Sequence, residues 1–138
     1  MINSVNVPVQ TVNLNGNVLF ATDRVRTNAC NCGGSIQHDA GSGLFTLAKP
    51  GIYEVNFNAN VTAATAGAVA FAIRSNGEAV GGTEMDYTVV TAETYQSISA
   101  STLIRVPCGA SKTVSVANVS PALQALVKDS NIIVRRVA

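Results

Sequence analysis

Residues 42–61, SGLFTLAKPGIYEVNFNANV, decide the fold of this chain. The second half of this stretch alternates between apolar and polar side chains, namely Tyr53, Val55, Phe57, Ala59 and Val61 against Glu54, Asn56, Asn58 and Asn60. A period of two is typical of a β-strand with one apolar and one polar face. Pro50 presets φ and Gly51 relieves crowding in a tight turn. The sequence therefore predicts two strands, 44–48 and 52–62, joined at Lys49-Pro50-Gly51.

The composition indicates a single β-rich domain. The chain has 138 residues, of which 12% are charged, and its mean hydropathy is +0.27. One domain of this length buries roughly two-thirds of its unfolded surface. The apolar runs are far shorter than the ~20 residues that a membrane-spanning helix needs. The chain is rich in Asn, Ser, Thr, Ala and Val and has few charged side chains with which to cover a solvent-exposed surface. Self-association would reduce that exposed surface, so the composition is a first indication of an oligomer.

Charge and targeting signals argue against several functional classes. The net charge is +1 and there is no tryptophan, so no nucleic-acid partner is expected, either by electrostatics or by base stacking. No membrane partner is expected either. Residues 1–10 show no positive segment followed by an apolar core and a cleavage site. We therefore expect a protein that is made in the cytoplasm without a signal peptide.

Short strand patterns continue along the rest of the chain. The sequence predicts further strands over 18–21, 35–38, 68–74, 78–82, 93–106, 112–119, 121–127 and 131–137. Asn15-Gly16 and Asn76-Gly77 are hairpin signals, whereas 23–34 and 83–91 are expected to be irregular. About ten short strands separated by regular turn signals predict an all-β antiparallel sandwich or jelly roll.

The N-terminal segment differs from the rest. Its valines alternate with polar residues over 5–14, but Pro8 removes a donor from any strand ladder. The segment is therefore predicted to be an edge strand or an arm that lies on another surface. We divide the chain into an arm or edge strand, residues 1–16, and one jelly-roll domain, residues 17–138.

The central motifs resemble a known family. Ile36, His38-Asp39, Gly43-Leu44-Phe45-Thr46 and the run from Pro50 to Phe57 are similar to the signature of the trimeric jelly-roll superfamily of the complement globular head and tumour necrosis factor. That signature combines a Gly-x-Phe strand, a Pro-Gly turn and a Gly-x-Tyr-x-Phe strand. Bacterial spore-surface glycoprotein heads and phage fibre or capsid-decoration domains share it, and the prokaryote-like composition is nearer to these members.

The resemblance implies a non-enzymatic homotrimer. The leading interpretation of this chain is a phage virion decoration, auxiliary capsid or fibre-tip protein on the virion surface. Residues 1–14 would attach it to other virion or surface-layer proteins. A bacterial cell- or spore-surface protein is a further alternative. The candidates for the trimer interface lie on apolar or small-residue strand faces: Tyr53, Val55, Phe57, Ala68, Ala70, Ala72, Ile132 and Val134.

A carbohydrate- or receptor-binding module of the same fold is the other main interpretation. Its candidate ligand-binding residues are Glu84, Asp86, Tyr87, Asn56 and Asn58, because carboxylates and amides suit the hydroxyls of glycans. Carboxylates at 84, 86 and 93 could also bind calcium, and a solvated loop is the simplest reading. The asparagine row suits a hydrogen-bond ladder between subunits equally well.

Catalytic and metal sites have little support in the sequence. His38 is the only histidine and is interpreted as a turn residue. Cys30, Cys32 and Cys108 could join it in a zinc site, or Cys108 could form a disulfide, but the C-x-C spacing is tight and reduced thiols are preferred. No phosphate-binding loop or metalloprotease motif is present, and one histidine suits a cupin-like enzyme poorly. We expect no cofactor, no catalytic residue and no enzyme.

Overall fold

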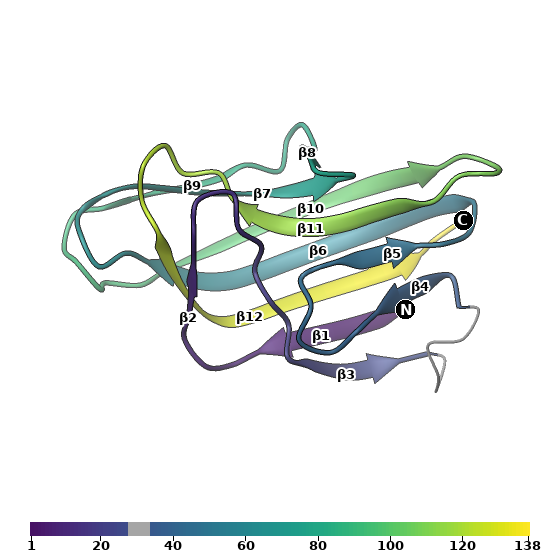
Figure 1. Cartoon of the computed structure of the whole chain (residues 1–138), viewed down its shortest axis with the longest axis horizontal. Coiled ribbons are helices and arrows are strands. Elements are labelled where there is room, and N and C mark those ends of the chain that lie inside the picture. Colours follow the sequence, from purple (N-terminus) through teal and green to yellow (C-terminus); the bar gives the residue numbers. More distant parts are fainter. Residues whose placement is uncertain (28–33) are drawn as a thin grey trace.

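The computed structural model describes residues 1–27 and 34–138, which form two antiparallel β-sheets packed face to face (Figure 1). The first sheet has the strand order β10-β6-β12-β1-β3, with β2 paired to β12. The second has the order β4-β5-β11-β7-β8, with β9 paired to β7. The described residues contain no helix, and therefore none that could cross a membrane. The prediction of an all-β antiparallel jelly-roll sandwich is confirmed.

Within residues 1–27 and 34–138, twelve strands make up the two sheets. Their bounds are β1 Ile2–Asn6, β2 Gln10–Val12, β3 Thr22–Arg26, β4 Ile36–His38, β5 Phe45–Leu47, β6 Gly51–Thr62, β7 Gly67–Ser75, β8 Glu78–Ala79, β9 Met85–Val89, β10 Gln96–Val106, β11 Lys112–Asn118 and β12 Ala125–Arg136.

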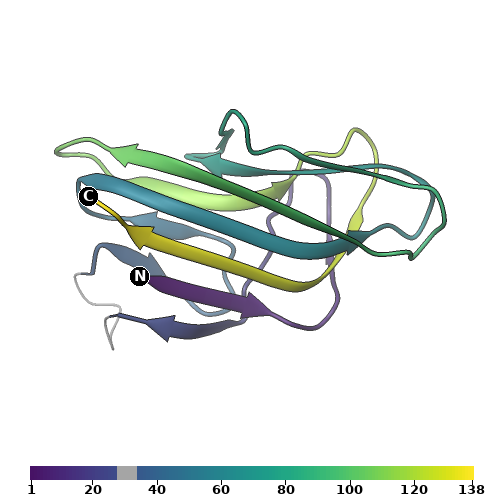
Figure 2. The same ribbon diagram turned by 180° about the vertical axis from the view of Figure 1, so that it is seen from behind.

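The alternating strand is β6, which pairs along its length with β10 on one side and with β12 on the other. Seen from behind, these three long strands lie next to one another, with β1 beyond β12 (Figure 2). The apolar side chains of β6 point between the two sheets and are buried, and Phe57 packs edge-on against Phe20. Phe20 also contacts Phe45 of the second sheet at a ring-centroid distance of 5.6 Å. Three aromatic rings thus fill the centre of the sandwich.

The turn before β6 requires its glycine. Gly51 has φ +149°, a conformation that side chains rarely adopt. A Cβ atom at this position would lie 2.5 Å from Nε of Arg136 and 2.6 Å from the carbonyl oxygen of Ala138. The turn therefore packs the start of β6 directly against the end of β12.

The N-terminal segment is more integrated than the sequence suggested. β1 pairs with β12 on one side and β3 on the other, so it is an interior strand of the first sheet. Only β2, which follows Pro8 and pairs with β12 alone, has the edge position that was expected for residues 5–14. Ile2 and Val12 belong to the core. The proposed boundary at residue 16 stays a prediction.

Four local predictions differ from the structure. Residues 85–89 form β9 instead of a loop, and residues 22–26 form β3 at the start of the segment that was expected to be irregular. Residues 18–21 form no strand, although Asn17 makes an isolated bridge with Ala117. The strand expected over 121–127 begins only at Ala125, where it continues into β12. β3 has no alternation of its own and forms through its pairing with β1. In β9, Met85, Tyr87 and Val89 alternate with Asp86 and Thr88, a strand pattern that the loop prediction overlooked.

Candidate functional site: the outer face of the first sheet

The outer face of the first sheet carries the largest ordered set of polar side chains. Strand register places Ser97, Asn60 and Lys128 side by side, and Ser99, Asn58 and Asn131 form the next row. Residues with the same orientation complete the face. We call this set the polar face; its members are Ser97, Ser99, Ser101 and Leu103 of β10, Glu54, Asn56, Asn58 and Asn60 of β6, and Lys128, Asn131, Ile133 and Arg135 of β12.

Hydrogen bonds between neighbouring strands order the polar face. The hydroxyl of Ser101 donates to Oδ1 of Asn56 at 2.6 Å, and the hydroxyl of Ser97 donates to Oδ1 of Asn60 at 2.9 Å. Nδ2 of Asn56 donates to a carboxylate oxygen of Glu54 at 2.8 Å. The two neutral cross-strand pairs, together with the bond to Glu54 within β6, hold the amides in fixed positions before any partner binds.

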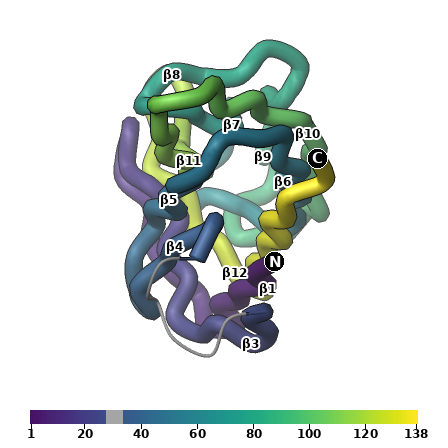
Figure 3. The backbone as a smooth tube through the Cα atoms, turned by 90° about the vertical axis from the view of Figure 1, so that its right-hand side faces the viewer, coloured from purple at the N-terminus to yellow at the C-terminus, as the bar shows by residue number. Residues whose placement is uncertain are grey.

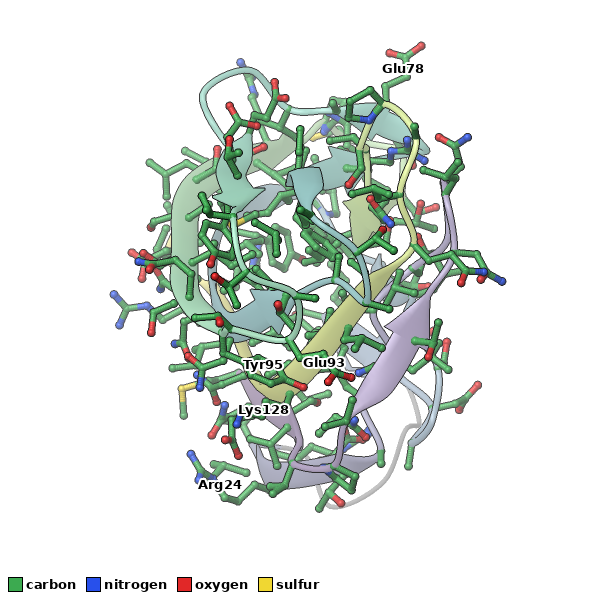
Figure 4. All side chains as sticks on the ribbon, turned by 90° about the vertical axis from the view of Figure 1, so that its left-hand side faces the viewer. Arg24, Glu78, Glu93, Tyr95 and Lys128 are labelled. Atoms are coloured by element: carbon green, nitrogen blue, oxygen red, sulfur yellow. The ribbon has the colours of Figure 1, made fainter. Side chains whose placement is uncertain are left out.

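The ladder continues across the sheet to β3. Nδ2 of Asn3, on β1, donates to Oδ1 of Asn131 at 2.6 Å. Oδ1 of Asn3 in turn accepts hydrogen bonds from Arg24 of β3, the shorter at 2.7 Å from Nη2. Arg24 itself is exposed at the far edge (Figure 4). Polar contacts therefore link strands from one side of the sheet to the other.

Charged groups on the polar face have partners within it. Arg135 donates through Nε and Nη2 to the two carboxylate oxygens of Glu54, at 3.1 and 3.2 Å. These bonds, followed by the bond from Asn56, lower the pKa of Glu54 below its usual range. At the opposite end, Nζ of Lys128 lies 4.0 Å from the ring centre of Tyr95, toward which it points (Figure 4). The middle of the face is left neutral.

Five of the predicted interface residues lie inside the protomer. Tyr53, Val55, Phe57, Ile132 and Val134 are at most 2% exposed and belong to the core between the two sheets. Their side chains contact the chain's own residues and offer no surface to a second copy. We therefore move the predicted interface from the inward face of β6 and β12 to the polar face on the other side of the same strands.

The alanine row of β7 is also mostly covered. Ala70 and Ala72 are buried in the single chain, although they point away from the core, and only Ala68 is exposed. The backbone of Ala70 is held by Ser120, whose hydroxyl accepts a hydrogen bond from the amide nitrogen of Ala70 at 2.9 Å. Loop 119–124 thus supplies part of the second surface that the two-sided apolar strand was expected to need.

The ligand-binding candidates separate into two places. Glu84, Asp86 and Tyr87 line a hollow of about 350 Å³ on the outside of the second sheet, whose lining includes Ala68 and Ala70. Asn56 and Asn58 lie on the polar face of the first sheet. The structure therefore brings together the first three candidates but not all five. Their role in binding stays a prediction.

A buried charged cluster, which the sequence did not reveal, joins the two sheets. Asp23 of β3 accepts hydrogen bonds from Ser4 of β1, from Arg26 and from Nδ1 of His38, the last at 2.6 Å. Nη2 of Arg26 also donates to the carbonyl oxygen of His38 at 2.7 Å. We call Ser4, Asp23, Arg26 and His38 the buried cluster; Ser4 and His38 are fully buried, whereas Asp23 and Arg26 are partly exposed. It connects edge strand β3 of the first sheet to edge strand β4 of the second.

His38 is the last residue of β4 and is buried, so its interpretation as a turn residue was wrong. Its ring stacks on Phe45 at 4.1 Å between centroids, and its Nε2 lies 2.8 Å from the carbonyl oxygen of Ser42. Both ring nitrogens thus face oxygen acceptors, and the pair of contacts is fully satisfied when both nitrogens carry a hydrogen. Ser4 bonds to the carboxylate and not to the imidazole, so this is not the geometry of an activated serine.

The environment of Asp23 favours its charged form. Burial alone would raise the pKa of this carboxyl. The hydrogen bonds from Ser4, His38 and Arg26, together with the positive charge of His38, outweigh burial and lower the pKa below its ordinary value. The cluster therefore holds a carboxylate at the junction of the two sheets.

The cysteine prediction is only partly visible. Cys108 is a free, exposed thiol in the turn after β10, whereas Cys30 and Cys32 lie outside the described residues. Among residues 1–27 and 34–138, no three His, Cys, Asp or Glu side chains come together in a way that could hold a metal ion. The four-ligand zinc alternative thus includes two residues on which the structure gives no information.

Comparisons with known proteins identify the fold. No protein-family model matches the chain, and no curated protein sequence is significantly similar to it. The globular domain of zebrafish complement 1qA is a similar solved structure, with a TM-score of 0.63, 14% identity, and coverage of 96% of this chain and 94% of that chain. Eiger TNF from S. frugiperda has a TM-score of 0.72 and 10% identity, covering 99% and 91%.

Murine APRIL is also similar, with a TM-score of 0.55, 13% identity, and coverage of 95% of each chain. At these identities the likeness shows the fold, which is a jelly roll of the kind found in tumour necrosis factor and the complement globular head. The family resemblance predicted from residues 36–57 is therefore confirmed at the level of fold. The nearer kinship to bacterial and phage members is part of the proposal below.

Proposed function

We propose that this chain is a non-enzymatic structural protein that assembles as a homotrimer through the polar face. The observation that carries the proposal is the pre-ordered, neutral hydrogen-bond ladder across the outer face of the first sheet. The centre of a protein interface is depleted in charge, and polar groups there must find partners. Asparagine amides supply both donors and acceptors, so the same side chains can pair with those of a neighbouring subunit.

A threefold ring needs a second, different contact surface on each subunit, because its interfaces are heterologous. We assign that surface to the free side of β10, the longest edge strand among the described strands, which pairs only with β6. A long unpaired edge is prone to uncontrolled pairing with other chains unless something covers it. Leu103 of β10, which belongs to the polar face, is 61% exposed and would be buried when a neighbouring copy packs on that face. Packing this edge against the polar face of the next copy would close the ring.

The test is the solution mass measured by light scattering, at micromolar concentration and after dilution into the nanomolar range. The wild-type chain should have the mass of three chains. Asn58→Arg places a long cation in the neutral middle of the polar face and should give a monomer, because an unpaired charge at an interface centre is costly. Thr88→Arg is the matched control, since Thr88 is exposed on β9 of the other sheet. A monomeric wild-type chain, or two variants with equal mass, would contradict the proposal.

Display on a phage particle is the narrower part of this proposal. The family resemblance and the prokaryote-like composition support it, with the surface of a bacterial cell or spore as the alternative. Removal of the N-terminal segment is a poor test of attachment, because β1 and Val12 are part of the folded sandwich. Val7 and Val9, between β1 and β2, are 63% and 53% exposed and are the better targets.

The attachment test therefore uses the double substitution Val7→Ser and Val9→Ser in the full-length chain. If residues 1–14 attach the protein to other virion or surface-layer proteins, this variant should keep its trimeric mass but no longer sediment with particles. Leu44→Ser is the control, because Leu44 is also an exposed apolar residue that lies outside the segment. Unchanged sedimentation of the double variant would remove the attachment role from this segment.

Glycan or receptor binding is a second candidate function, favoured by the hollow beside Glu84 and Asp86. Tyr87 shapes one side of this hollow, and its hydroxyl is fixed by a 3.1 Å bond to the carbonyl oxygen of Thr94. A glycan array should show binding that Asp86→Ala abolishes and that Glu78→Ala, an exposed carboxylate on β8 outside the hollow, leaves intact. An array without binding at any concentration would count against this function.

A further inference from the structure

A basic hollow lies at the end of the sandwich where both chain ends are found. Figure 3 views the molecule from this end, with the start of β1, the end of β12, β3 and β4 close together. The hollow has a volume of about 450 Å³, and its described lining includes Arg26, Arg135, Arg136, Thr27 and Ser35. This size is within the range of pockets that bind small molecules. Three arginines thus line one hollow on a chain whose net charge is only +1.

The three arginines are held by contacts outside the hollow. Arg26 is anchored in the buried cluster through Asp23 and the carbonyl oxygen of His38. Arg135 pairs with Glu54 on the polar face. Nη2 of Arg136 donates to the carbonyl oxygen of Pro50 at 2.5 Å, which fixes its position against the turn before β6. Neither of the two carboxylates that pair with these arginines lines the hollow itself.

The three arginines that line the hollow outnumber the two carboxylates that pair with them. Asp23 offsets Arg26 and Glu54 offsets Arg135, whereas Arg136 makes no ion pair within the part of the chain that the structure describes. A guanidinium carries five N–H donors, and the hydrogen bonds to described residues use only one of those of Arg136. The group is therefore a fixed cation that still has donors to offer.

We propose that this hollow binds an oxyanion, either a phosphate or a carboxylate group of a small ligand. Arginine is suited to these groups because its planar fork matches two oxygens of one anion. Arg136 would make the main contact, Arg135 and Arg26 would add positive potential, and the hydroxyl of Ser35 would add a donor. The site is separate from the assembly proposed above and does not depend on it, because its main contact comes from a residue outside the polar face.

The test is calorimetric titration of the full-length chain at low ionic strength, with sodium pyrophosphate and sodium citrate as probes. We expect one saturable site per chain for at least one probe, and the probe that binds more tightly identifies the anion chemistry. Arg136→Gln should weaken binding by about tenfold or more, since loss of a charge-assisted bidentate contact is worth at least about 1.4 kcal/mol. Arg136→Lys keeps the charge but loses the fork, so it should give a smaller loss.

The matched control is Arg74→Gln. Arg74 lies on β7 of the second sheet, and its side chain makes one hydrogen bond, to Asn15 at 3.2 Å, as that of Arg136 makes one to Pro50. Removal of this positive charge should leave the affinity for the probe within about twofold of the wild-type value. Equal losses in Arg136→Gln and Arg74→Gln would show attraction to the net charge alone and would overturn the site, as would the absence of saturable binding for both probes.

Discussion

The buried cluster and the polar face are both hydrogen-bonded networks, but they occupy opposite kinds of place. The buried cluster is charged, mostly shielded from solvent, and shared between edge strands of two sheets. The polar face is neutral in its centre, lies on one sheet, and is open to solvent. If a partner is removed in the interior, an unsatisfied charge remains, whereas water replaces a lost partner on the surface. The same polar chemistry therefore stabilises the fold in one place and is available for recognition in the other.

The largest expected effect comes from removing the carboxylate of the buried cluster. Asp23→Ala should lower the free energy of unfolding by about 3 kcal/mol, because it leaves Arg26 and His38 without their shared anion. Urea denaturation measures this change. Asp86→Ala is the control, since Asp86 is an exposed carboxylate on β9, and it should change the free energy by less than about 0.5 kcal/mol. Equal effects would mean that the cluster does not hold the sheets together.

One substitution made in both networks sharpens the comparison. Ser4 is fully buried and donates to Asp23, whereas Ser101 is exposed and donates to Asn56. Ser4→Ala should cost about 1–2 kcal/mol of unfolding free energy, and Ser101→Ala should stay within about 0.5 kcal/mol. Thermal or urea unfolding of the two variants at protein concentrations below the dissociation point of any oligomer provides the measurement. A larger loss for Ser101→Ala would reverse the assignment of the two networks.

A smaller effect is expected from acid. The pKa of Asp23 is lower in the folded chain than its ordinary value of 3.8, so this carboxyl contributes stability that is fully present above that value. The contribution is lost as the pH falls through the lowered folded pKa. The free energy of unfolding of the wild-type chain should therefore decrease more between pH 5 and pH 2 than that of Asp23→Asn. Parallel pH profiles for the two proteins would contradict this linkage.

Local patterns in the sequence predicted the strands that carry their own signals. The alternation of residues 52–62 gave β6, and Asn76-Gly77 gave the hairpin to β8, where both residues adopt positive φ. β3 was missed because TDRVR has weak alternation, whereas MDYTV does alternate and was missed because residues 83–91 were interpreted as a loop. Both segments become strands through β1 and β7, their partners in the sheets. The residue pattern of a segment does not show the backbone hydrogen bonds that a neighbouring strand from elsewhere in the chain will provide.

The buried cluster was invisible for a related reason. Asp23 and His38 lie in edge strands of different sheets, and a segment between them was expected to be irregular. The sequence contains no spacing rule for a contact across two sheets. Asp39 follows His38 directly in the sequence, but in the folded chain Nδ1 of His38 contacts Asp23, which lies 15 residues earlier.

The sequence by itself determined that β6 has an apolar and a polar face, because side chains of a strand alternate whatever surrounds it. It also determined the tight turn at Gly51 and the all-β class. Only the tertiary structure decided that Tyr53, Val55 and Phe57 meet the second sheet of the same chain, and that the asparagines face outward. The physical reason is that alternation defines two faces, whereas the packing of one sheet on the other decides which surface each face contacts.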